Sequence, residues 1–138
     1  MASTDELKQY NQALIAEFRA NGGEVSGSHP VLLLTTVGAK SGQPHTSPLG
    51  YSSDGERLIV IGAYSGAPIH PAWYHNLVAN PDVTVELGRE RLAMRAVVTE
   101  GAERERLFNQ RAAEAPWVVK YQAMTTRQLP VVVLERGG

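Results

Sequence analysis

The chain has 138 residues, of which 43% are hydrophobic and 20% charged, a size and composition typical of one globular domain. A net charge of −1 without any basic block excludes a general attraction to nucleic acid or to anionic membranes. The absence of cysteine excludes disulfides, thiolate metal sites and cysteine nucleophiles. Apolar runs are strand-sized, so no integral membrane segment is expected, and the acidic start without an apolar segment predicts a cytoplasmic protein.

The first 22 residues predict a helix. Ser3 and Glu6 have the spacing of a capping box, and apolar residues follow at a period of 3.6. Asn21-Gly22-Gly23 then ends the helix, because glycine tolerates the left-handed conformation of a C-cap.

Short runs rich in β-branched residues follow, separated by turn residues and helical segments. Ser53-Asp54-Gly55-Glu56 is a hairpin turn, because Asp-Gly accepts positive φ angles. Strands are expected at 31–37, 46–52, 57–63, 83–87, 91–99 and 129–134, and helices at 72–79, 102–115 and 118–125. Turns this short cannot carry parallel crossovers, so we expect an α+β fold, a small antiparallel barrel forming a single domain over residues 1–138.

Common catalytic motifs do not match. Gly38-Ala39-Lys40-Ser41 lacks the glycines of a phosphate-binding P-loop. His70 and His75 would lie about 140° apart on a helix, and no carboxylate cluster accompanies them, so no metal site is expected. No Gly-x-Ser-x-Gly elbow indicates a serine hydrolase.

Two segments contain residues that are suited to binding a ligand. Residues 35–49 run from a buried strand through a loop with two glycines, several hydroxyls and Lys40, which suits an anion, although by itself the pattern favours a polar hairpin loop. Residues 62–77 combine a small-residue strand end with Trp73 and Tyr74, which suits a flat ring, although by itself the aromatic pair favours core packing.

Together these segments resemble the deazaflavin (coenzyme F420)-dependent nitroreductase family. The resemblance rests on Leu-Leu-Thr-Thr, Gly-x-Lys-Ser-Gly-x-Pro, Pro-Ala-Trp-Tyr-His-Asn-Leu at 71–77 and Asn-Pro-Asp-Val-Thr-Val-Glu at 80–86. It covers residues 31–135. It implies a split β-barrel of the FMN-binding type that binds reduced F420 and passes hydride to a small organic acceptor: a quinone, a nitroaromatic or an activated enone.

The resemblance also implies a site. Lys40 matches the lysine that holds the anionic part of the cofactor, and Tyr121 matches a tyrosine near the acceptor, where it acts in catalysis or only in packing. Ala39, His45 and Tyr64 stand where relatives often carry basic residues. The expected cofactor-binding residues are Lys40, Ser41, Gly42, Gln43, Pro44, His45, Pro48, Ala63, Tyr64, Ser65, Gly66, Ala67 and Trp73.

Two alternatives to this function, and the oligomeric state, stay open at this point. The same barrel could use FMN or FAD in place of F420. It could also bind a cofactor, a haem or a lipid without turnover. Either a monomer or a homodimer fits the sequence.

Overall fold

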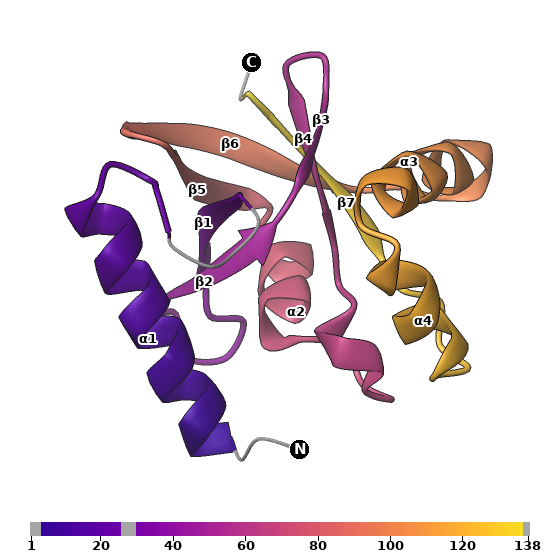
Figure 1. Cartoon of the computed structure of the whole chain (residues 1–138), viewed down its shortest axis with the longest axis horizontal. Helices are drawn as coiled ribbons and strands as arrows, with labels where there is room; N and C mark the ends of the chain where they lie inside the picture. The colour runs from indigo at the N-terminus through magenta and orange to yellow at the C-terminus, as the bar shows by residue number, and fades with distance from the viewer. Residues whose placement is uncertain (1–3, 26–29, 137–138) are drawn as a thin grey trace.

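The computed structural model describes residues 4–25 and 30–136, so Ser3 of the predicted capping box lies outside the described residues. Seven antiparallel strands form one sheet, flanked by helices (Figure 1). The elements in chain order are α1 (Thr4–Ala20), β1 (Val31–Val37), β2 (Pro44–Gly50), β3 (Ser52–Asp54), β4 (Arg57–Ile61), the 3-10 turn η1 (Tyr64–Gly66), α2 (Ala72–Ala79), β5 (Asp82–Leu87), β6 (Glu90–Val98), α3 (Gly101–Glu114), α4 (Trp117–Ala123) and β7 (Val131–Arg136).

The strand order shows why this sheet curls. It is β2-β1-β5-β6-β7-β4-β3, with β2 and β3 at opposite ends. Only Tyr51 separates these two strands along the chain. The two ends of the sheet must therefore approach each other at Tyr51, which curls the sheet into an open half-barrel with a seam where β2 passes into β3, and confirms the expected split β-barrel fold.

The buried residues form two separate cores, and β4 and β7 contribute alternate residues to both of them. One face of the sheet packs around α2, and the other packs against α3 and α4, which flank β4 and β7 in Figure 1. The cluster around α2 contains Leu32, Leu34, Leu58, Val60, Trp73, Leu77, Val83, Val85, Met94, Ala96, Val132 and Leu134. Because Val132 and Leu134 face α2 while Val131 and Val133 face α3, β7 is buried on both sides and reads as a continuous apolar run.

Two strand predictions differ from the structure. The single strand expected at 46–52 is two strands, β2 and β3, because the chain leaves β1 at Gly50 and pairs next with β4. The strand expected to reach residue 63 ends at Ile61, and η1 follows. The first difference falls where the chain changes its pairing partner, which no local pattern encodes.

Candidate functional site

Three cavities lie in series between the loop after β1 and helix α4. The loop cavity, of about 570 Å³, is lined by Gly38, Ala39, Lys40, Ser41, His45, Thr46, Ser47, Ala72, Trp73, His75 and Asn76. The middle cavity, of about 310 Å³, is lined by Asn11, Ser47, Pro48, Leu49, Ile61, Tyr64, Ser65, Pro71, Ala72 and Trp73. The α4 cavity, of about 240 Å³, is lined by Val31, Leu49, Gly50, Ile61, Ala63, Arg111, Trp117, Val118 and Tyr121. Neighbouring cavities share walls: Trp73 borders the first two, and Leu49 borders the last two.

The loop cavity suits an anion. Lys40 brings a positive charge, and His45 and His75 bring imidazoles, whereas no carboxylate occurs among the described residues of its lining. The loop closes through Gly38 N–H donating to the Gln43 carbonyl at 2.8 Å, and Gly42 adopts a φ of 71° that favours glycine. The turn therefore holds Lys40 at the rim of the cavity.

The buried side chain of Asn76 anchors the loop between β1 and β2 to helix α2. Its side chain is only 8% exposed, accepts the Ala39 N–H at 3.0 Å and donates to Thr36 Oγ1 at 3.1 Å. A buried amide with both ends bonded ties α2 to the β1 end of the loop. Sequence reasoning missed this residue, although it lies inside the motif at 71–77.

The middle cavity borders a strained turn. Tyr64 and Ser65 have φ angles of 45° and 53°, in the left-handed region that residues other than glycine rarely adopt. Such a conformation persists only where its surroundings enforce it, and it is common at binding sites.

Arg127 supplies that enforcement. Its guanidinium donates to the carbonyls of Ala67 (2.8 Å), Gly62 (3.0 Å) and Ala63 (2.9 Å), and its Nη1 lies 3.1 Å from His70 Nδ1. One side chain thus satisfies three carbonyls on either side of η1. Sequence reasoning missed Arg127 as a site residue because these partners lie about 60 residues earlier in the chain.

This contact gives stability a pH dependence. Burial, then Arg127 and then His75 hold the pKa of His70 below its ordinary value. Above the ordinary pKa of about 6.5 the imidazole is neutral in both states. As pH falls below that value, the unfolded chain takes up the proton more readily than the folded one, so stability is lost.

We therefore expect the melting temperature of the protein to fall between pH 7 and pH 5, and to fall less in His70→Gln. Asp54 and Glu86, whose pKa values are lowered mainly by hydrogen bonds from Arg57 and Arg19, titrate below this window. Thermal melts of the two proteins at both pH values measure the difference. Equal losses in the two proteins would contradict the role given to His70.

The structure brings most predicted site residues to the three cavities and leaves others outside. The lining residues are Lys40, Ser41, His45, Pro48, Ala63, Tyr64, Ser65, Trp73 and Tyr121. Gly42, Gln43 and Pro44 lie exposed around the hairpin turn and line none of the three. Gly66 is buried against α4, and the Ala67 carbonyl is bonded by Arg127.

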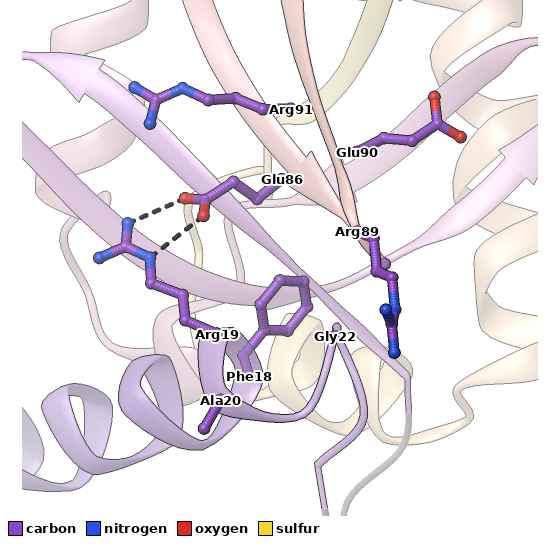
Figure 2. A pocket seen from close by; sticks show the side chains of 9 residues that line it. Phe18, Arg19, Ala20, Gly22, Glu86, Arg89, Glu90 and Arg91 are labelled. Carbon is purple, nitrogen blue, oxygen red and sulfur yellow. Dashed lines mark hydrogen bonds and ion pairs between the residues drawn. The ribbon is translucent and has the colours of Figure 1, made fainter.

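A fourth cavity, of about 340 Å³, lies between the end of α1 and the β5–β6 hairpin. Arg19 pairs there with Glu86 through two contacts of 3.1 and 2.9 Å, which fasten α1 to the sheet (Figure 2). Arg89, Glu90 and Arg91 point away from one another in Figure 2. Because these charges diverge, the cavity does not present a converging set of groups to a ligand.

Within residues 4–25 and 30–136, no helix combines the length and hydropathy needed to cross a membrane. Within the same residues, no three side chains of the metal-binding types gather in one place.

Comparisons with known proteins point to one family. A family model described as F420H(2)-dependent quinone reductase matches residues 9–136. The F420H(2)-dependent quinone reductase Rv1261c of Mycobacterium tuberculosis is 38% identical over 120 residues, covering 83% of this chain and 79% of that protein.

Solved structures agree. One described as an F420-H2 dependent reductase (FDR-A) is 36% identical with a TM-score of 0.71, covering 79% of this chain and all of that one. Another, described as a domain-swapped dimer, is 32% identical with a TM-score of 0.74, covering 97% of this chain and all of that one. The haem storage protein HutZ of Vibrio cholerae, at 18% identity and a TM-score of 0.59, shares the fold alone.

Proposed function

The chain belongs to the F420H(2)-dependent quinone reductase family, and from this we propose that it is an oxidoreductase that binds reduced F420 and reduces a small organic acceptor. Quinones are the acceptor class named for its relatives, and nitroaromatics and activated enones are the further classes that we propose.

The run of three cavities is the observation that carries this proposal. F420 joins a flat deazaflavin ring to a phosphodiester and a glutamate tail, so it needs a long site with a cationic end. The loop cavity has Lys40 and a lining whose described residues carry no carboxylate. The middle cavity has Trp73, 8% exposed, as a flat wall. The residues present therefore fit the cofactor.

In this proposal Lys40, Ser41 and His45 hold the anionic tail, and Pro48, Tyr64, Ser65 and Trp73 hold the ring. Gly42, Gln43 and Pro44 contribute through the shape of the turn, and Gly66 and Ala67 through the shape of η1. When bound, the reduced deazaflavin supplies the hydride, so no protein nucleophile is required.

The chain's own groups then act on the acceptor. Tyr121 lines the α4 cavity and is proposed to donate a hydrogen bond to the negative charge that develops on the acceptor. Leu49 and Ile61, which border both the middle and the α4 cavities, form an apolar wall that limits water at the junction.

The decisive experiment is a titration of the purified protein with F420, FMN, FAD and haem, followed by absorbance. We expect tight binding of F420 alone, and anaerobic oxidation of reduced F420 on addition of a quinone. Preferential binding of FMN or FAD would transfer the proposal to a flavin. Binding of haem or F420 without turnover would favour a storage or sequestering protein.

Position 45 offers a gain-of-binding prediction. His45 lies beside the loop, its Nε2 3.4 Å from Ser41 Oγ, at a position where the family resemblance implies a basic residue. We expect His45→Arg to lower the F420 dissociation constant about tenfold, because a permanent cation adds one charge-assisted contact. Calorimetric titration of His45→Arg and His45→Gln measures this, and equal affinities in both variants would show that position 45 does not contact the tail.

For assembly and location, we propose a cytoplasmic monomer or homodimer. A solved relative is described as a domain-swapped dimer, which makes exchange of an element between two copies the form of homodimer to test. Light scattering across protein concentrations distinguishes the two states.

A further inference from the structure

Arg111 is a buried cation that the proposed chemistry has not yet used. It lies on α3, is only 9% exposed and lines the α4 cavity. It also lines an adjoining cavity of about 300 Å³ formed by Pro30, Tyr51, Ser52, Ser53, Arg111, Glu114 and Trp117. A guanidinium in such a place requires partners for its donors.

One of its two terminal nitrogens has a structural role. Nη1 donates to the Tyr51 carbonyl at 3.0 Å and to Ser52 Oγ at 3.3 Å, which holds the seam where β2 passes into β3. These are the hydrogen bonds that Arg111 makes with the described residues.

The other terminal nitrogen, Nη2, lies against Gly50. A Cβ built on Gly50 would stand 2.6 Å from Nη2, so a side chain at position 50 would have to displace the end of the Arg111 side chain. Gly50 and Arg111 both line the α4 cavity, so the contact between Gly50 and Nη2 lies within the lining of this cavity.

The surroundings of Arg111 favour a strong electrostatic interaction between its guanidinium and a bound anion. Val31, Leu49, Ile61 and Val118 form apolar walls of the same cavity. Burial lowers the pKa of Arg111, and Glu114 opposes this effect, yet an arginine stays charged at all working pH values. A buried cation interacts more strongly with an anionic oxygen than it would in water.

Building on the proposed function, we propose that Nη2 of Arg111 binds an oxygen of the acceptor in the α4 cavity and selects acceptors whose oxygen is or becomes anionic. In quinone reduction the acceptor gains a hydride, which brings two electrons and one proton from the reduced deazaflavin. One carbonyl oxygen then carries the negative charge of the hydroquinone monoanion, and a proton from solvent neutralises it. Arg111 stabilises that oxygen. In this proposal Arg111 determines acceptor specificity, in addition to the role given to Tyr121.

The test compares two non-covalent probes of equal ring size: naphthoquinone, which is neutral, and a hydroxynaphthoquinone whose hydroxyl is ionised at neutral pH. Binding is measured by calorimetry with oxidised F420 present, so that no turnover occurs, and again without F420. We expect the native protein to bind the anionic probe about tenfold more tightly, the effect of one charge-assisted contact.

Three variants test whether the Nη2 end of Arg111 causes the preference for the anionic probe. Gly50→Ala keeps the positive charge but displaces the Nη2 end of the guanidinium, and it should reduce the preference for the anion while the F420 affinity stays close to native. Arg111→Gln should abolish the preference. Arg106→Gln removes an exposed arginine of the same helix, paired with Asp54 and Glu103, and should keep it.

Equal binding of the two probes by the native protein would overturn the inference, and so would an unchanged preference in Gly50→Ala. Should Arg111→Gln not fold, Gly50→Ala still decides. Failure of the proposed function would look different: no F420 binding and no quinone reduction, with the preference for the anionic probe still measured without F420.

Discussion

Replacing Lys40 by alanine is expected to raise the dissociation constant for F420 about tenfold or more. Lys40 is the one lysine or arginine in the described lining of the loop cavity, and its neighbour in the loop, Ala39, carries no charge. A single charge-assisted contact is worth about 1.5–3 kcal/mol, so its loss is large when few other cations share the tail.

The matched control is Lys120→Ala. Lys120 is an exposed lysine on α4 that lines none of the three cavities, so its removal changes the net charge equally without touching the site. Titration of both variants at low and at moderate salt completes the test, because screening should shrink the effect of Lys40→Ala. An unchanged constant at low salt would remove Lys40 from the site.

The sequence predicts the barrel well because the barrel is built from local hairpins. Asp54 and Gly55 lie at the β3–β4 turn, and α2 spans the expected residues 72–79, because both features are encoded by residues within a few positions of each other. The break at Tyr51 was not predicted, since it depends on β2 and β3 joining opposite edges of the sheet. A run of seven suitable residues does not show where the chain changes its pairing partner.

The residues of the candidate site also fall into those that local sequence patterns predict and those that only the packed structure reveals. Lys40 and Trp73 could be predicted because they lie inside contiguous segments with a family resemblance. Asn76, Arg111 and Arg127 were not assigned a role, because each acts on backbone or side chains about 40 to 65 residues away in the chain. Charged and amide side chains usually face solvent, so their burial becomes visible only once the elements are packed.

At Gly66 the sequence and the structure each explain part of the expected role, and replacing this residue should have a large effect on F420 binding. The sequence suggests only that a small residue lets the loop approach a ring. In the structure Gly66 has a φ of 76°, and a Cβ there would stand 2.9 Å from Met124 Cβ and 3.1 Å from the Tyr121 carbonyl oxygen. A side chain at position 66 therefore pushes η1 and α4 apart.

We expect Gly66→Val to abolish F420 binding while the barrel still folds, because the displacement disturbs the Tyr64–Ser65 turn of the middle cavity and Tyr121 of the α4 cavity together. Gly55→Val is the matched control: its φ is 63°, so the left-handed strain of about 1–2 kcal/mol is similar, but a Cβ there meets nothing within 4 Å. F420 titration and thermal melts of both variants separate the collision at α4 from the backbone strain. If Gly66→Val bound F420 normally, η1 would be only a turn, and the cofactor ring would have to lie elsewhere.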